Sequence, residues 1–410
     1  MQSSSLRQIS ILMATVFADM VGFTMVLPLL PFYATRCGAN ATVVGSLVAT
    51  YAFAQLITAP LWGRASDRWG RRPLILTGLL ASAVAYVLFG LADVLWLLFA
   101  SRLVQGAGGG INGVVQAYVA DAVEPEERAK ALGWLTAATS AGVMIGPAMG
   151  SLATNLRPEA PGFLAAALCI LNFLFALYWL PEPPRESVPS GPDTPPRRSL
   201  RSSFVDVLRH PRSPVPSLIW IYAFGMMAFM AMDRVLALYL KAEFGVTEKN
   251  IGFFFAYVGG ISLVMRGVML GPAVRRFGEV GVTRLGALSL VIGLACIPLA
   301  KYIPLASHLP GLALVILFVP VGTALLFPAT TAQVSRRSPK GETGQILGVQ
   351  QSFGSVARMV GPLWAGFVFQ EVGQAWPFWL AAILMLGVSL LTWRQPNGRP
   401  EPAPAVVQEA

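Results

Sequence analysis

The stretch that decides the fold is Gly63-Arg64-Ala65-Ser66-Asp67-Arg68-Trp69-Gly70-Arg71-Arg72, a short basic segment between two long apolar runs at 41–62 and 73–92. Runs of about 20 apolar residues are long enough to cross a bilayer as helices. Because so short a connection joins them, the two helices are expected to be antiparallel. Lys and Arg accumulate in cytoplasmic loops. The four arginines therefore predict a loop on the cytoplasmic side, which orients the rest of the chain.

The composition excludes a soluble globular protein. Of the 410 residues, 55% are hydrophobic and 12% are charged, about half of the roughly 25% that is typical of soluble domains. The net charge of +10 lies mainly in short segments between apolar runs, which indicates lipid headgroups and not nucleic acid as its partner. The three cysteines are far apart in the sequence. Neither a metal site nor a catalytic triad is readable, so we predict no metal and no enzyme activity.

We predict an all-α, multi-pass integral membrane protein with both termini in the cytoplasm, in a bacterial inner membrane. With this orientation, 21 of the 30 Lys and Arg residues fall in cytoplasmic segments and five fall in outer loops, as the positive-inside rule requires. The chain shows twelve apolar ranges that are expected to span the bilayer: 9–32, 41–62, 73–92, 95–119, 130–154, 161–180, 215–240, 250–270, 282–301, 311–334, 343–369 and 374–393.

A long polar segment divides these ranges into six and six. We predict an N-terminal six-helix bundle over 1–180, a cytoplasmic linker over 181–214 with a short amphipathic helix at Ser203–Arg209 on the inner membrane surface, a C-terminal six-helix bundle over 215–394 and a disordered tail over 395–410. The first basic segment has a partial echo in the second half, Gly271-x-x-x-Arg275-Arg276-Phe277-Gly278. Two parallel six-helix repeats are typical of transporters whose halves rock about a central site.

The segment 63–72 matches the pattern GxxxDRxGRR residue by residue. With the twelve ranges, it resembles the signature of the major facilitator superfamily and, within it, of the drug/proton antiporters that include tetracycline and multidrug exporters. The resemblance implies that Asp67 caps the eleventh helix across the interface between the halves and that Arg68 or Arg71 bonds Asp121. The alternative is that the arginines only set topology and bind lipid. The implied gating motif comprises Gly63, Asp67, Arg68, Gly70, Arg71, Arg72 and Asp121.

Asp19 lies about ten residues into the first range, near the middle of the membrane at ~1.5 Å per residue. An ionisable residue at that depth is costly and is a functional candidate. Asp19-x-x-Gly22 and Arg102-x-x-Gln105-Gly106 resemble the first-helix and fourth-helix patterns of the antiporters. We expect Asp19 to carry a proton and Arg102, which stays charged, to tune its affinity. The alternatives are a structural aspartate and a fixed ion pair.

The fifth range contains Gly142, Gly146, Pro147 and Gly150, which resemble the motif of the antiporter branches. The resemblance implies antiport. As structure, the same residues predict a stripe for close helix packing and a proline bend.

Further charges occur in the second half. Asp233 and Arg234 are adjacent and should point about 100° apart on a helix, so they are not expected to pair with each other. Arg358, in the middle of the eleventh range, is a candidate partner for Asp233, and a substrate role and a structural pair both remain open. Arg266 is expected to extend to the membrane interface. Other polar or aromatic residues that could line a cavity are Gln55, Asn112, Gln116, Tyr222, Tyr257 and Gln333.

These features favour a proton-coupled exporter of hydrophobic or cationic drug-like molecules that works by alternating access. Its expected partners are a small-molecule substrate, protons and membrane lipids. It is expected to be a monomer that needs no cofactor besides the proton gradient. The alternatives are an exchanger or flippase of a lipid-like or metabolite substrate, and a non-transporting receptor. The ninth range, 282–301, has no carboxylate. The tetracycline antiporters carry an acid there, which argues against tetracycline itself as substrate.

Overall fold

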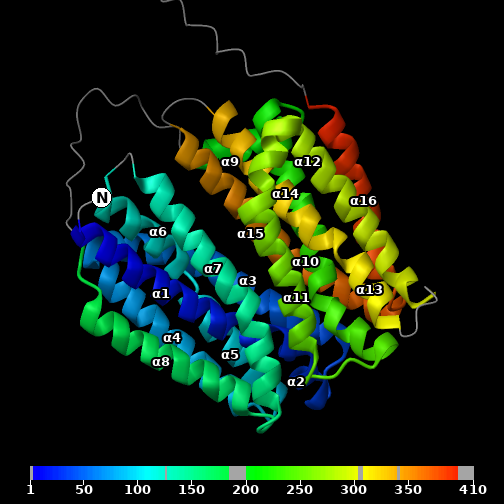
Figure 1. Ribbon diagram of the computed structural model, residues 1–410, viewed down its shortest axis with the longest axis horizontal. Coiled ribbons are helices and arrows are strands. Elements are labelled where there is room, and N and C mark those ends of the chain that lie inside the picture. The colour runs from blue at the N-terminus through cyan, green and yellow to red at the C-terminus, as the bar shows by residue number, and fades with distance from the viewer. Residues whose placement is uncertain (1–2, 125–126, 184–199, 303–307, 339–341, 396–410) are drawn as a thin grey trace, which may run out of the picture.

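The computed structural model describes residues 3–124, 127–183, 200–302, 308–338 and 342–395, and all elements in these ranges are helical (Figure 1). The linker residues 184–199 and the tail residues 396–410 lie outside them. The first group of helices comprises α1 (Ser3–Val26), η1 (Leu27–Leu29), α2 (Leu30–Arg36), α3 (Ala41–Trp69), α4 (Arg71–Gly90), α5 (Leu95–Gly108), α6 (Ile111–Ala122), α7 (Arg128–Thr154) and α8 (Ala160–Trp179).

The second group follows the short helix α9 (Leu200–Arg209). It comprises α10 (Pro214–Phe244), α11 (Ile251–Val264), η2 (Met265–Met269), α12 (Leu270–Cys296), η3 (Ile297–Tyr302), α13 (His308–Ile316), α14 (Phe318–Arg337), α15 (Thr343–Glu371) and α16 (Trp376–Trp393).

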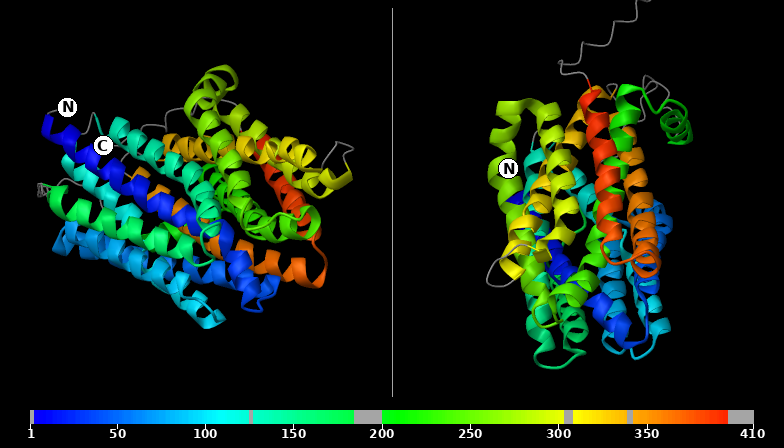
Figure 2. Two further views of the ribbon diagram at one scale, coloured as in Figure 1. Left: turned by 60° about the horizontal axis from the view of Figure 1, so that its bottom comes forward. Right: turned by 90° about the vertical axis from the view of Figure 1, so that its right-hand side faces the viewer.

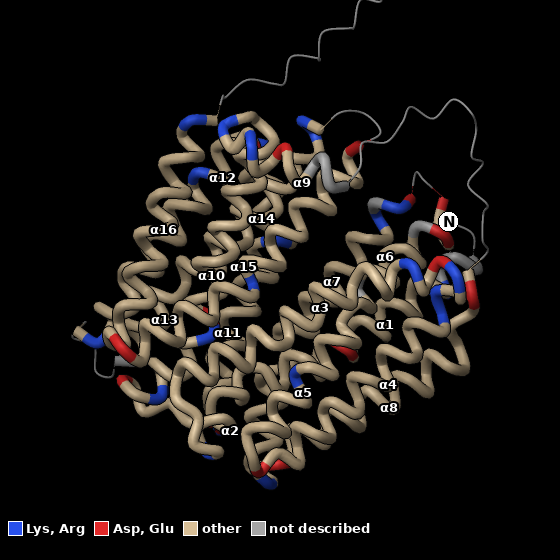
Figure 3. The backbone as a smooth tube through the Cα atoms, turned by 180° about the vertical axis from the view of Figure 1, so that it is seen from behind, with Lys and Arg blue, Asp and Glu red and all other residues tan. Residues whose placement is uncertain are grey.

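Helices cover each of the predicted apolar ranges, which confirms an all-α membrane protein. Eight helical stretches in the described chain are long and apolar enough to cross a bilayer. One of them, Ile251–Tyr302, has 52 residues and is broken at Gly278 by a φ of 68°, so it is long enough to hold two spans. The count of twelve spans stays a prediction. Charged residues gather at the two ends of the helices and are sparse between them (Figure 3), as a membrane belt requires.

The two groups of helices meet at one end of the molecule and stand apart at the other (Figures 1 and 2). Their main contacts join elements that are far apart in sequence: α3 packs against α15, and α7 packs against α11. Both ends of the described chain lie at the end where the groups stand apart. We call this the open end, and we call the opposite end the closed end.

The segment that decides the fold is more helical than expected. Instead of a loop over 63–72, α3 continues to Trp69 and α4 begins at Arg71, so that Gly70 alone connects them. Gly70 has a φ of 108°, which favours glycine. A Cβ at this position would also lie 2.6 Å from Oε1 of Glu182. The predicted loop is therefore a one-residue turn between two helices.

The fourth predicted range is broken in its middle, at Gly109 and Gly110, between α5 and α6. The carbonyls near a break need other donors inside a membrane. Gln55 Nε2 donates to the carbonyl of Gly109 at 3.0 Å, and Trp62 Nε1 donates to that of Ala107 at 2.5 Å. Gln55, which was expected to line a cavity, instead stabilises the broken helix.

The predicted linker helix is present as α9, and its apolar face packs on the second group. Phe204 stacks on Phe353 of α15 at a centroid distance of 5.2 Å. Trp220 Nε1 of α10 donates to the carbonyl of Val207 at 3.2 Å. The apolar face that was expected to lie on the membrane surface therefore covers α10 and α15.

Candidate functional site

A central cavity of about 400 Å³ lies between the two groups of helices. Elements of the first group that line it are α1, η1, α2, α3 and α7, and those of the second are α10, α11, η2, α14 and α15. A largely apolar wall with a few polar groups is typical of small-molecule sites. The large apolar side chains of the wall include Phe23, Met226, Phe229, Met230, Phe255 and Phe327.

Four charged side chains line the same cavity, one acid and three arginines. Asp233 Oδ2 lies 3.2 Å from Nε of Arg234, so the two form an ion pair. The expectation that they could not pair was wrong, because the long arginine stem lets the guanidinium reach back around the helix. Arg358 Nη2 donates to Oγ of Ser355 at 2.9 Å. Among the described residues no ion pair joins Arg358 to Asp233, so that predicted partnership is also wrong.

Arg266 lines the cavity, which the sequence did not indicate. The expected extension of its side chain to the membrane interface stays a prediction. It lies in the π-helical turn Met265–Met269, between α11 and α12. Each residue of a π turn is rotated differently from one in a regular α-helix, and such turns occur frequently at functional sites. The sequence could not reveal this turn, because no residue type encodes it.

A second, much smaller space of about 20 Å³ surrounds Asp19. It is large enough for about one water molecule. Tyr51, Tyr86 and Gln105 contribute to its wall, and Gln105 Nε2 donates to the Tyr86 hydroxyl at 2.7 Å. Phe23 lines both this space and the central cavity. The two spaces therefore share Phe23, which brings the candidate proton carrier next to the candidate substrate site.

Arg102 is 1% exposed, but the structure does not show it paired with Asp19. Its guanidinium carbon lies 5.5 Å from the centroid of the Phe89 ring, and its Nε lies 3.5 Å from Oγ of Ser101. Within the described residues Nη2 has no hydrogen-bond partner, and no ion pair joins Arg102 to Asp19. The alternative of a fixed ion pair is therefore wrong for this conformation. A tuning role at longer range stays a prediction.

The glycine motif of the fifth range forms the contact between α7 and α1. A Cβ added at Gly142, Gly146 or Gly150 would lie 2.8, 2.6 or 2.2 Å, respectively, from a backbone oxygen of α1. Thr24 of α1 adds a hydrogen bond to the carbonyl of Gly142 at 3.2 Å. The packing stripe is thus confirmed, and it holds the helix that carries Asp19. The implied link to antiport stays a prediction.

Arg71 joins two acids at the open end. Its Nη1 lies 2.5 Å from Oδ1 of Asp67, and its Nε donates to Oδ2 of Asp121 at 2.8 Å. The implied bond between this motif and Asp121 is confirmed for Arg71, whereas Arg68 is exposed. Charge-assisted contacts of this kind are stronger than neutral ones, so Arg71 fixes the open ends of α3, α4 and α6 to each other.

Asp67 does not cap α15 in this structure. Its side chain is 66% exposed and pairs with Arg71, because the two groups of helices stand apart here. The carboxylate that does cap a helix is Glu182, which accepts from the backbone N–H of Arg71 at 2.6 Å and of Arg72 at 3.0 Å, at the start of α4. An acid at a helix N-terminus is stabilised by the helix dipole. No sequence pattern pointed to Glu182.

Two further candidates are structural and do not line the cavity. Gln333 Nε2 of α14 donates to Oγ1 of Thr283 in α12 at 2.7 Å. The Tyr257 hydroxyl donates to the carbonyl of Ala313 at 3.2 Å. Both side chains stabilise contacts within the second group.

The three other residues that were expected to line the cavity have different locations. Tyr222 is buried, and its ring lies 5.4 Å from that of Phe327, which lines the cavity. Gln116 is exposed and is not part of the cavity wall. The side chain of Asn112 lies outside the described part of the structure.

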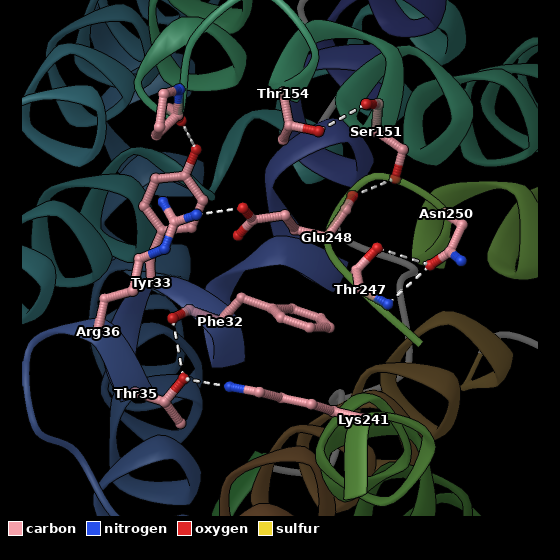
Figure 4. Close-up of polar contacts among 11 residues, drawn as sticks. Phe32, Tyr33, Thr35, Arg36, Ser151, Thr154, Lys241, Thr247, Glu248 and Asn250 are labelled. Atoms are coloured by element: carbon pink, nitrogen blue, oxygen red, sulfur yellow. Dashed lines mark hydrogen bonds and ion pairs between the residues drawn. The ribbon is translucent and has the colours of Figure 1, made fainter. Parts of the chain in front are cut away.

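Polar contacts between the two groups occur at the closed end (Figure 4). Arg36 forms an ion pair with Glu248. Ser151 Oγ donates to the Glu248 carbonyl at 2.7 Å and accepts from the N–H of Gly252 at 2.7 Å, and Lys241 Nζ donates to a threonine hydroxyl of α2 at 3.3 Å. Among the described residues, hydrogen bonds between the groups all lie toward this end. Polar contacts therefore hold the two groups together at the closed end.

Comparisons with known proteins agree with this architecture. Multidrug resistance protein 1 of Bacillus subtilis (strain 168) is 30% identical over 95% of this chain and 96% of its own length. The class B tetracycline resistance protein of Escherichia coli is 26% identical over 93% and 95%. The crystal structure of the human organic anion transporter MFSD10 (TETRAN) is 23% identical, with a TM-score of 0.69 over 95% of this chain and 100% of its own, and supports the fold alone. The family model described as Major Facilitator Superfamily matches residues 12–362 and 302–409. The chain therefore belongs to the major facilitator superfamily.

Proposed function

We propose that this chain is a secondary active transporter that exports hydrophobic, drug-like small molecules in exchange for protons. The observation that carries the proposal is the largely apolar cavity between two groups of helices, which meet at one end, and the carboxylate beside it. The names of the relatives in Bacillus subtilis and Escherichia coli, which describe resistance to drugs, support it. Range 282–301 contains no carboxylate, so tetracycline is not the substrate that we propose.

We infer that the open end faces the cytoplasm of a bacterial cell. The open end carries the Arg71 cluster and both ends of the described chain, and Lys and Arg favour the cytoplasmic side. In this arrangement the cavity takes substrate from the cytoplasm. Rocking of residues 1–180 against residues 215–394 would close the open end, separate the closed end and release the substrate outside.

The proposed coupling depends on Asp19 and its position beside Phe23. A proton that enters from outside neutralises Asp19, and its release to the cytoplasm restores the charge. The neutral and charged forms of a carboxylate differ greatly in the cost of burial. Each form therefore favours a different arrangement of α1, and α1 also lines the substrate cavity. The energy source is the proton gradient, with no further cofactor.

A transport assay tests this proposal directly. The purified protein is reconstituted into vesicles that are acidic inside, and uptake of a fluorescent hydrophobic drug is followed before and after a protonophore collapses the gradient. Exchange with protons predicts accumulation that depends on the gradient and is lost at once with the protonophore. Equal uptake with and without a gradient would contradict proton coupling, and absence of any uptake across a panel of such drugs would contradict export.

Asp67→Asn should slow transport about fivefold and leave substrate binding unchanged. In the state that is closed toward the cytoplasm, we propose that Asp67 caps α15, and such a cap contributes ~1 kcal/mol. Initial rates of uptake and equilibrium binding are measured on the same preparation. Asp67→Glu, which keeps the carboxylate, serves as the conservative control and should restore most of the rate. A normal rate for Asp67→Asn would leave Asp67 without a gating role.

A further inference from the structure

The central cavity carries an excess of positive charge. Of the residues that the structure describes, Asp233 is the one carboxylate that lines it, against the guanidinium groups of Arg234, Arg266 and Arg358. The ion pair between Asp233 and Arg234 balances one charge of each sign. Two arginines remain, and among the described residues neither forms an ion pair with an acid.

Arg358 is poised to hold an anion. It lies near the middle of α15, with about half of the helix on each side, so its charge is far from both membrane surfaces. The contact that the structure gives it is a hydrogen bond from Nη2 to the Ser355 hydroxyl, while a guanidinium offers five donors. A charged group at this depth usually pairs with an opposite charge. The remaining donors of Arg358 therefore have room for a ligand that supplies that charge.

Arg266 belongs to the same region. Arg266 and Arg358 line the same cavity. The Tyr222 ring and Arg358 are neighbours, since a Cβ added at Gly354 would lie 2.7 Å from the ring and 3.6 Å from Nη1 of Arg358. Guanidinium groups from α15 and from the π turn thus face one cavity. Side chains of Phe229, Phe255 and Phe327 form the apolar wall beside them.

We propose that the substrate is an amphipathic organic anion, whose apolar body lies against the aromatic wall and whose carboxylate is held by Arg358 and Arg266. Guanidinium groups bind carboxylates through paired, charge-assisted hydrogen bonds. The inference rests on the proposed function, which it deepens by naming the charge of the transported molecule. The sequence favours hydrophobic or cationic compounds. The proposal keeps the hydrophobic body and replaces the positive charge by a carboxylate.

Three probes with one apolar body test the charge. 1-Pyrenebutyrate is an anion, 1-pyrenebutanol is neutral and 1-pyrenebutylamine is a cation. Binding to the purified full-length protein in a neutral detergent is measured by fluorescence titration at pH 7.5. We expect the anion to bind about tenfold more tightly than the alcohol, ~1.4 kcal/mol, and the amine to bind more weakly than the alcohol. Equal affinities, or tighter binding of the amine, would overturn the inference.

Variants identify the groups that cause the preference. Arg358→Gln and Arg266→Gln should each lower the affinity for the anion toward that of the alcohol and leave the affinity for the alcohol unchanged, which shows that the cavity is intact. Arg275→Gln, an exposed arginine outside the cavity, should keep the preference. A preference for the anion that survives in both cavity variants would assign it to other residues and refute the site.

The binding result is independent of proton coupling. If vesicles show no uptake driven by a gradient but the three probes keep their order, the proposed exchange with protons fails and the anion site stands. If uptake is driven by the gradient but the anion is not preferred, the anion site alone fails. Competition of phosphatidylglycerol with the anion would identify a lipid anion as the occupant, whereas its absence would identify a soluble one.

Discussion

Vesicles that contain Asp19→Asn should bind substrate normally but should not accumulate it when they are acidic inside. Asp19 is the carboxylate of the small space beside the central cavity, enclosed by Tyr51, Tyr86 and Gln105. Asparagine has a similar shape and no proton to exchange, so the variant should still alternate but without coupling. For one proton per substrate, a gradient of about two pH units is worth ~2.7 kcal/mol, or about a hundredfold accumulation. All of that accumulation should be lost.

The measurement has two parts on one preparation. Uptake driven by the pH gradient should disappear, while exchange of labelled for unlabelled substrate without a gradient should continue. Asp93→Asn, which removes an exposed acid from the turn after α4, is the matched control and should behave like the unmodified protein. Uptake by Asp19→Asn that still follows the gradient would show that another group carries the proton.

Two contacts within the first group of helices followed from the sequence. Arg71 meets Asp121 because both lie at the same ends of packed helices, and the resemblance of segment 63–72 named Asp121 and offered Arg68 or Arg71 as its partner. The glycines at 142, 146 and 150 occur every four residues, which fixes them to one face of α7, and they form the close helix contact that this spacing predicts, here with α1.

Contacts that depend on conformation or on a flexible side chain could not be predicted. Asp67 was expected to cap α15, but a cap across two groups exists only while they touch at that end. Asp233 and Arg234 were not expected to pair because their Cα–Cβ bonds point in different directions. The arginine side chain is long enough to reach the carboxylate nevertheless. Arg266 lies in a π turn and lines the cavity, and its position along the sequence indicates neither.

Gly252→Ala should lower the rate of transport by about fivefold or more, because the closed end could no longer close fully. A Cβ at this position would lie 1.8 Å from the carbonyl oxygen of Pro147 and 2.6 Å from Oγ of Ser151, both in α7 of the other group. Backbone cannot move aside as a flexible side chain can, so α11 and α7 must separate. Overpacking of this kind costs about 1–3 kcal/mol, which is roughly a 5- to 150-fold shift in the population of the closed end. Each group keeps its own packing, so the variant should still fold.

The shift can be measured as a distance. Spin labels report the opening of the closed end when the three native cysteines are replaced. They are placed at two exposed positions on opposite groups: Leu156→Cys, just after the end of α7, and Lys249→Cys, next to Glu248 of the closed end. Gly252→Ala should move the distance distribution to longer values and slow transport in parallel. Gly387→Ala in α16, where no atom lies within 4 Å of the added Cβ, should change neither. An unchanged distribution with normal transport for Gly252→Ala would mean that the contact of α11 with Pro147 is not required for the cycle. A longer distance together with slower transport would give α7 two contacts that matter for the cycle. Its glycines pack against α1, the helix that contains Asp19, and its Pro147 packs against Gly252 of α11 at the closed end.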